Sequence, residues 1–377
     1  MRASVSSSGD QGNAGGREPS ISADGRFVAF TSDSTNLVPG DVNSRADIFV
    51  HDLMNGTTEL VSVDSSGAAA NDYSMLPAIS GDGQLVSFSS NATNLVPGDT
   101  NGRLDVFAHD RITGATERIS VGSAGEQGDD HSYRSRLSFD GRLVVFESRS
   151  RNLVSPPDDD LWCDVFVRDR QLGTTELISM SLTGTGGHGD SFLALSGDPM
   201  TADGNSVVFQ SGAPDLVANG VPGVYLRDRG RAVTQFLSVD FKNDPAGGAD
   251  ASISADGQLV TFESNGEMVE GDDPQIDDIW VRRIGGSIAR LSNSVSGGEP
   301  NEFSIDAALS RDGSTVAFYS EASDLVSGDG NGVGDVFSVP VPSCIGVADA
   351  VTYGSGWPGS SGVPSLTSSG APNLCSV

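Results

Sequence analysis

The chain has 377 residues, of which 37% are hydrophobic and only 19% are charged, a balance that excludes an intrinsically disordered chain. The 51 Asp and Glu residues outnumber the 22 Lys and Arg residues, and the resulting net charge of −29 argues against a nucleic acid partner. No run of eighteen apolar residues occurs, so we expect no membrane insertion, and the first residues lack the apolar core of a signal peptide.

A unit of four short β-rich runs recurs along the chain. In the first copy the runs are 20–22, 27–30, 47–50 and 58–63, and residues 77–121 align with residues 19–63 without a gap. An isolated four-stranded sheet cannot bury both of its faces, so the repeat predicts an all-β fold, a six-bladed β-propeller of four-stranded blades. One Asp-Gly turn marks each copy: Asp24-Gly25, Asp82-Gly83, Asp140-Gly141, Asp203-Gly204, Asp256-Gly257 and Asp312-Gly313.

The two ends of the repeat array predict how the propeller closes. Residues 2–6 match the fourth run of the second copy, 118–121, whereas the sixth copy ends after its third run. We therefore expect the N-terminal strand to supply the missing fourth strand of the sixth blade and to cover an exposed sheet edge. This places the propeller at 1–342 and leaves a short Gly/Pro-rich C-terminal tail, 343–377, either a chain end or the start of a truncated small module.

The repeat resembles the WD-repeat-like propeller repeats of the TolB type. The shared pattern is a Ser-x-Asp-Gly turn followed by a Val-Ala-Phe strand, and it begins at Ser22, Ser254 and Ser310. The resemblance covers residues 1–342. It implies a propeller that acts as a protein-interaction platform, and the tail is similar to small modules on exported bacterial proteins.

The loops between the second and third runs have the most specific polar pattern. Hard oxygen side chains at relative positions 1, 3 and 7 resemble part of a calcium loop that lacks its closing Glu, and they predict structural Ca²⁺ sites. A second interpretation stays open, because Asp and Asn in turns also bond their own backbone. The predicted ligands are Asp41, Asn43 and Asp47; Asp99, Asn101 and Asp105; Asp158, Asp160 and Asp164; and Asp329, Asn331 and Asp335. The fifth loop, with Asp272-Asp273-Pro274, fits this pattern less well, and the fourth does not fit.

The cysteines and histidines form no metal or catalytic signature. Cys344 and Cys375 bracket the tail and would form a disulfide in an oxidising compartment, whereas Cys163 is expected to be a buried thiol. His51 and His109 occupy one repeat position that holds arginine in other copies, so we expect them on the surface.

These patterns favour a binding protein over an enzyme. No Gly-x-Ser-x-Gly sequence and no dinucleotide or phosphate loop is present. We expect a monomeric, extracellular or periplasmic scaffold that recognises a protein or polysaccharide through the edge that has the long loops. The alternative is a carboxylate-based lyase or hydrolase in the central channel. That alternative requires charged side chains on the first strands, where we expect mainly Ser, Ile and Ala.

Overall fold

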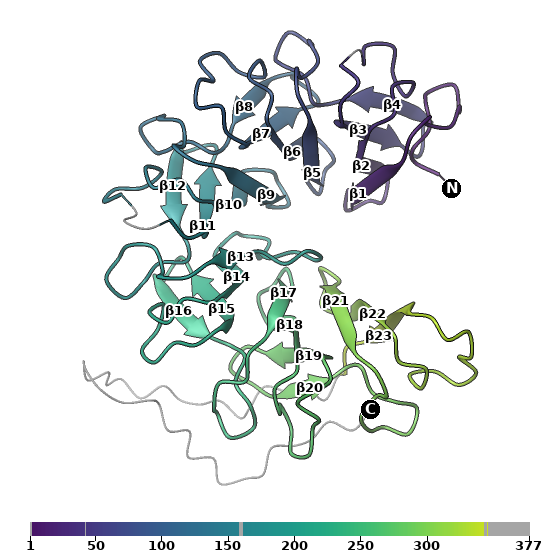
Figure 1. Cartoon of the computed structure of the whole chain (residues 1–377), viewed down its shortest axis with the longest axis vertical. Helices are drawn as coiled ribbons and strands as arrows, with labels where there is room; N and C mark the ends of the chain where they lie inside the picture. Colours follow the sequence, from purple (N-terminus) through teal and green to yellow (C-terminus); the bar gives the residue numbers. More distant parts are fainter. Residues whose placement is uncertain (1, 42, 158–160, 343–344, 346–377) are drawn as a thin grey trace. The chain divides into compact units, whose positions relative to one another are not determined.

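The computed structural model describes residues 2–41, 43–157, 161–342 and 345, which belong to two compact units. Unit 1 consists of Met1–Leu193 and Pro199–Phe236, and unit 2 consists of Ala194–Asp198 and Leu237–Val377. The regular structure in the described residues is antiparallel β-sheet (Figure 1). No helix in this part of the chain is long and apolar enough to cross a membrane.

Unit 1 contains four sheets, and each consists of four strands in sequence order. The first sheet comprises β1 (Gly16–Ile21), β2 (Phe27–Ser32), β3 (Asp47–Asp52) and β4 (Thr57–Leu60). The second comprises β5 (Ser74–Ile79), β6 (Leu85–Ser90), β7 (Asp105–Asp110) and β8 (Thr116–Arg118). The third comprises β9 (Ser132–Leu137), β10 (Leu143–Ser148), β11 (Asp164–Asp169) and β12 (Thr174–Leu177). The fourth comprises β13 (Ser191–Phe192), β14 (Ser206–Ser211), β15 (Gly223–Asp228) and β16 (Val233–Phe236).

Unit 2 contains the fifth and sixth sheets. The fifth comprises β17 (Ala249–Ile253), β18 (Leu259–Ser264), β19 (Asp278–Arg283) and β20 (Ile288–Arg290). The sixth comprises β21 (Ser304–Leu309), β22 (Thr315–Ser320) and β23 (Asp335–Pro340), so in the described residues it has three strands. Nearly all residues after β23 lie outside the described part of the chain, so the expected end of the sixth copy after its third strand stays a prediction.

An Asp-Gly turn shapes each sheet, and a stacked aromatic pair packs in five of them. In the first sheet the Ser22 hydroxyl donates to Asp24 at 2.6 Å and accepts the backbone N–H of Phe27 at 2.9 Å, which holds the turn between β1 and β2. Phe30 on β2 stacks on Phe49 on β3 with a centroid distance of 5.8 Å. Equivalent pairs with centroid distances of 5.7 to 6.1 Å recur in the second, third, fourth and sixth sheets.

The strands differ from the predicted runs at their ends. The first strand begins at Gly16 rather than at residue 20 and has a bulge between Arg17 and Ser20. The fourth strand ends at Leu60. The N–H of Val61 still donates to the carbonyl of Ile48 at 2.9 Å, but the N–H of Ile48 donates to the Ser62 hydroxyl at 3.1 Å instead of to a backbone carbonyl.

The N-terminal segment has the structure of the chain that follows a fourth strand. Its bridge between Val5 and Gln11 repeats the bridge between Val121 and Gln127 that follows β8. The N–H of Thr58 on β4 donates to the Ser7 hydroxyl at 2.9 Å, as the N–H of its equivalent on β8 donates to an equivalent serine. The expectation that this segment completes the sixth sheet stays a prediction.

Other sequence expectations have mixed outcomes. Cys163 is buried and has a free thiol, as predicted. The prediction for His51 and His109 is wrong: both are buried, and Nδ1 of each ring lies 2.8 Å from a threonine hydroxyl of the neighbouring fourth strand. The tail, including Cys344 and Cys375, lies outside the described residues apart from Ile345, so the boundary at residue 342 stays a prediction.

Two Asp-Gly turns provide a matched test of packing between sheets. Gly25 and Gly83 both have positive φ, at 71° and 72°, but an added Cβ meets nothing at Gly25 and lies 2.3 Å from the Phe27 ring at Gly83. We expect Gly83→Ala to destabilise the protein by about 1–3 kcal/mol more than Gly25→Ala, because only Gly83→Ala adds a steric clash to the shared backbone strain. Urea unfolding of both variants measures the difference. Equal losses would contradict this account.

Candidate functional site

The predicted ligands of the first sheet lie in the loop between β2 and β3. Asp47 begins β3 and is buried, and its carboxylate accepts from the Ser62 hydroxyl at 2.7 Å and from Nδ2 of Asn43 at 2.8 Å. Nδ2 of Asn43 also donates to the carbonyl of Ala70, and Oδ1 accepts the N–H of Arg45. Both the Nδ2 and the Oδ1 of Asn43 therefore take part in fixing the loop.

The same asparagine contacts recur in two other loops. Nδ2 of Asn101 donates to Asp105 at 3.0 Å and to the carbonyl of Gly128 at 3.0 Å. In the sixth sheet, Nδ2 of Asn331 donates to Asp335 at 2.9 Å. These contacts support the interpretation of the asparagines as turn residues.

The third loop is only partly described. Asp164 is buried and accepts from the Ser179 hydroxyl at 2.5 Å. Asp158 and Asp160 lie outside the described residues.

An arginine that the sequence analysis did not identify lies between the two aspartates of the second sheet. Nη2 of Arg118, the last residue of β8, lies 3.1 Å from Asp99, and its Nε lies 3.8 Å from Asp105. Nη1 donates to Oε1 of Gln127 at 2.6 Å. All three charged side chains are buried, at 6%, 2% and 0% exposure, so the arginine offsets the charge of two desolvated carboxylates.

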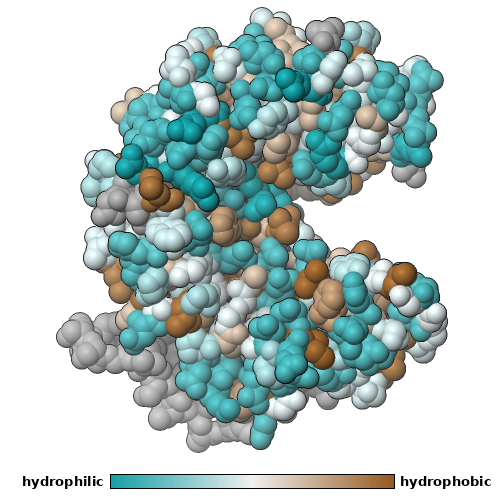
Figure 2. Space-filling model, viewed as in Figure 1, coloured by the Kyte–Doolittle hydropathy of each residue, from teal (hydrophilic) through white to brown (hydrophobic). Residues whose placement is uncertain are grey.

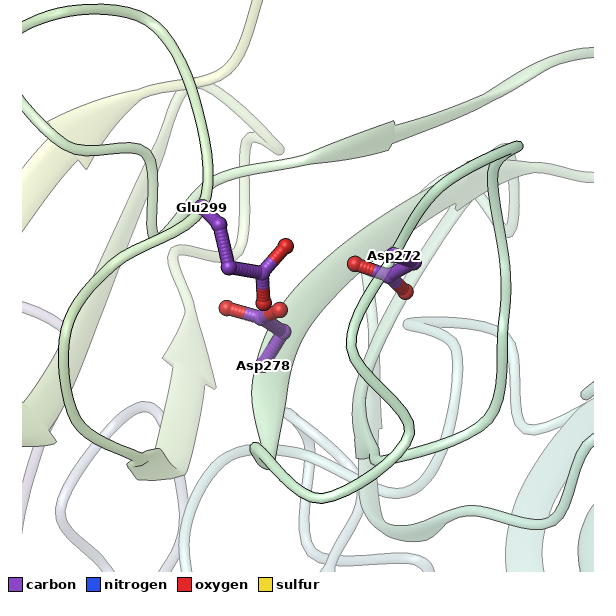
Figure 3. A group of neighbouring side chains, drawn as sticks. All are labelled: Asp272, Asp278 and Glu299. Atoms are coloured by element: carbon purple, nitrogen blue, oxygen red, sulfur yellow. The ribbon is translucent and has the colours of Figure 1, made fainter.

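The fifth sheet has the same arrangement with a third carboxylate. Figure 3 shows the three carboxylates, Asp272, Asp278 and Glu299. Nη1 of Arg290 lies 2.8 Å from Asp272 and 3.0 Å from Asp278, and it also contacts Glu299. The three carboxylates offer oxygen atoms within 4.8 Å of one another, a spacing that suits a metal ion, although the guanidinium lies among them. Burial raises the pKa values of Asp272 and Asp278 to about 7, although Arg290 opposes the shift.

The first sheet has no such arginine. Arg118 and Arg290 face an aromatic residue of the third strand, Phe107 or Trp280, and the residue that faces the equivalent Phe49 is Leu60. Leu60 packs against the hydrophobic cluster of Phe30, Leu37 and Phe49.

Asp41 is buried without a counter-charge. Its exposure is 7%, and neither carboxylate oxygen has a hydrogen-bond partner among the described residues. Burial raises the pKa of Asp41, and the nearby N–H of Asn43 offsets only part of this effect. Burial also raises the pKa of Asp47 to about 6, with a further contribution from the charge of Asp41.

In five of the six sheets, hydrogen bonds between described residues join the long loops along one edge. The N–H of Asn71, which precedes β5, donates to Oδ1 of Asn94 at 2.9 Å, and the N–H of Thr93 donates back to Oδ1 of Asn71 at 2.9 Å. Nδ2 of Asn94 donates to the carbonyl of Ala69 at 2.9 Å. We call the edge formed by these joined loops the loop face. Similar pairs join Asn13 to Asn36, Asp129 to Asn152, His188 to Asp215, and Asn301 to Asp324.

Charged residues on the first strands were missed by the sequence analysis. The expectation of mainly Ser, Ile and Ala there is wrong at Glu18, Arg134, Asp250 and Asp306. Each lies in a β-bulge six positions before the Asp of its Asp-Gly turn, and this offset is a signal that the sequence contains. Glu18, Asp250 and Asp306 have positive φ of 45° to 58°, a strained conformation for residues other than glycine.

In unit 2 these residues form an acidic group around Glu263 on β18. Oε2 of Glu263 accepts the N–H of Asp306 at 3.2 Å. Burial raises the pKa of Glu263 to about 7, with contributions from the charges of Asp250, Asp277 and Asp306. In unit 1 the equivalent Glu147 pairs with Nη1 of Arg134 at 3.0 Å.

Solved structures with the same fold identify the architecture. No family model and no curated protein matches the sequence. A prolyl endopeptidase structure matches with 14% identity and a TM-score of 0.50, over 87% of this chain and 42% of that chain. The chain has the fold of a six-bladed β-propeller. At this level of identity the likeness shows the fold alone.

TolB structures are also among the neighbours of this propeller. TolB from Acinetobacter baumannii matches with 14% identity and a TM-score of 0.44, over 85% of this chain and 64% of that chain. A putative TolB from Agrobacterium tumefaciens matches with 15% identity and a TM-score of 0.43, over 87% and 91%. The propeller thus spans less than two thirds of the first TolB chain.

Removing the guanidinium of the fifth sheet tests its role. We expect Arg290→Met to lower the free energy of unfolding by about 3–5 kcal/mol at pH 8, because three carboxylates then lose their cation. The loss is smaller at pH 5, below the pKa of about 7 of Asp272 and Asp278, where both accept protons. Urea unfolding at both pH values measures this.

The matched control for Arg290→Met is Arg231→Met. The Arg231 side chain is 82% exposed and pairs with Asp228 on the surface, so its removal costs about 0–1 kcal/mol at either pH. A loss for Arg290→Met that is no larger than this would show that the buried carboxylates do not need the guanidinium.

Glu263 gives a second pH test. A carboxyl whose folded pKa is raised stabilises the fold at low pH, and this contribution is lost as pH rises through about 7. We expect Glu263→Gln to raise Tm by a few degrees at pH 8 and to leave it almost unchanged at pH 5, because the amide oxygen still accepts the N–H of Asp306. Thermal unfolding at both pH values, with exposed Glu302→Gln as control, decides this. A pH-independent effect would contradict it.

Proposed function

We propose that this propeller is a non-catalytic, exported scaffold that recognises a protein or polysaccharide through its loop face. The observation that carries the proposal is the repeated pairing of the long loops, as between Asn71 and Asn94. Loops usually lose conformational entropy when they bind, and this loss reduces affinity. Loops already fixed by reciprocal hydrogen bonds avoid much of that cost, which suits a preformed binding surface.

The net charge of the protein limits the kinds of partner that it can bind. The net charge of −29 favours a protein with a basic surface or a neutral polysaccharide over an acidic polymer. Polar residues predominate on the face seen in Figure 2, with hydrophobic residues scattered among them. This composition suits a reversible partner better than an obligate apolar interface. A location outside the cytoplasm, either periplasmic or extracellular, belongs to the same proposal.

The acidic group around Glu263 favours a second candidate, a carboxylate-based lyase or hydrolase. A carboxyl with a pKa of about 7 is suited to general acid catalysis. Its contacts support a structural role instead. Glu18 on β1, Glu147 on β10 and Glu263 on β18 each accept a backbone N–H from the following sheet, from Leu76, from Leu193 just after β13, and from Asp306. A glutamate that bonds the backbone of the next sheet in three places is what packing between neighbouring blades requires.

A binding screen with matched variants tests the scaffold proposal. The purified full chain is screened against exported proteins and against basic, neutral and acidic polysaccharides, and each binder is measured by calorimetry. We expect saturable binding of an unmodified ligand. Asn94→Ala removes two hydrogen bonds from the loop face, so we expect it to weaken binding by about tenfold through loop disorder.

The control is Asn55→Ala in the hairpin between β3 and β4, at the opposite edge of the sheet, where Nδ2 donates to Asp52 at 2.8 Å. It should leave the affinity unchanged. Mass spectrometry of the bound ligand separates the two candidates: a cleaved or eliminated product would establish an enzyme and overturn the scaffold proposal. Equal effects of the two substitutions would show that the loop face is not the binding surface.

A further inference from the structure

We propose that Asp41 and Asp47 bind a calcium ion at the position that an arginine guanidinium occupies in the second and fifth sheets. This site is independent of the partner proposed above. The second and fifth sheets show what the pair requires. There the equivalent aspartates converge on one cation, Arg118 or Arg290.

The first sheet keeps the carboxylates and lacks the cation. Asp47 begins β3 as Asp105 begins β7 and Asp278 begins β19, and in all three sheets the other aspartate lies six residues earlier in the chain. From this shared spacing we infer that the two carboxylates of the first sheet face one point. Leu60 replaces the arginine and packs on the hydrophobic cluster with Phe49, as the arginine packs over Phe107 or Trp280. Leu60 therefore keeps the packing of the arginine side chain on the aromatic ring and lacks its positive charge.

The Asp41 carboxylate is the second observation that points to a ligand. Asp41 is only 7% exposed, and neither oxygen of its carboxylate has a hydrogen-bond partner in the described part of the chain. A buried carboxylate without a partner is costly unless a proton or a cation neutralises it. In the second and fifth sheets the aspartates at the equivalent positions share one guanidinium, so we expect Asp41 and Asp47 to share one cation.

The donor set favours calcium over other cations. Carboxylate oxygens are hard ligands, and two of them, with water completing the shell, suit an ion that accepts six to eight oxygens in a flexible geometry. Mg²⁺ demands near-ideal octahedral geometry and gives up its water reluctantly, so we expect it to bind more weakly. Asp41 and Asp47 provide the negative charge of the site, because the only ligand atom that the Asn43 amide can offer is its neutral Oδ1, which already accepts the N–H of Arg45.

Supplying the missing guanidinium is the sharpest test. Calorimetric titration of CaCl2 into the metal-free full chain counts the bound ions in the wild type and in Leu60→Arg. We expect Leu60→Arg to bind one ion fewer and to lose the Ca²⁺-dependent rise in Tm of several degrees, while its Tm in EDTA exceeds that of the wild type. The matched control is Leu172→Arg, the same change at a side chain that is 67% exposed, which should bind as many ions as the wild type.

Two further variants keep the test decisive. Asp41→Asn retains the size of the side chain, removes one ligand charge and should also bind one ion fewer, which decides the matter if Leu60→Arg fails to fold. Arg118→Leu should bind one ion more, because it frees Asp99 and Asp105. A count of bound ions unchanged by Leu60→Arg and Asp41→Asn, or a wild type that binds no Ca²⁺, would overturn the proposal. Equal binding of MgCl2 and CaCl2 would overturn the assignment to calcium.

Discussion

A carboxylate buried at the start of the third strand is the constraint on which the rest of the first, second, third and fifth sheets depends. In the first sheet, Asp47 accepts the Ser62 hydroxyl, and the same hydroxyl accepts the N–H of Ile48. The chain after the fourth strand is thereby tied to the start of the third. The contact recurs at Asp105 with Ser120, at Asp164 with Ser179 and at Asp278 with Ser292. One serine satisfies both a carboxylate and a backbone donor at each of these positions.

A single serine does not neutralise a buried carboxylate, and the sheets differ in the group that neutralises it. The second and fifth sheets use an arginine from the end of the fourth strand, and the first sheet has a leucine there. Divergence among the repeats has thus changed the electrostatics of a fixed backbone. A buried arginine provides a permanent positive charge, whereas a leucine leaves neutralisation to a proton or a bound ion.

The local part of this architecture could be predicted from sequence, and the long-range part could not. The Asp-Gly turns and the Asp-Ile-Phe strands are visible because their signals lie within a few residues of one another, as at Asp24 and Asp47. The contact of Arg118 with Asp99 depends on the register of three strands, and no local pattern reports that register. Glu299 was missed for the same reason, since it reaches the site from the connection after β20. The charged bulge residues did have a local signal, the offset of six positions before the Asp of the Asp-Gly turn. Their position in the structure could not be predicted, because it depends on a β-bulge that the sequence does not reveal.

The contacts to buried carboxylates and the hydrogen bonds between loops have different roles, the first inside a blade and the second at its edge. Within a blade, serine and arginine contacts satisfy buried carboxylates, so those acids contribute little to the field outside the protein. Most of the net charge of −29 must therefore come from the exposed acids. At the edge, backbone N–H groups fix the loops by donating to a side-chain oxygen, which belongs to an asparagine in pairs such as Asn71 with Asn94 and to an aspartate in pairs such as Asn301 with Asp324. Because either an asparagine or an aspartate can accept this bond, the charge of the loops can change from blade to blade without loosening the surface. A repeated scaffold can in this way present different partner-binding chemistry on each blade.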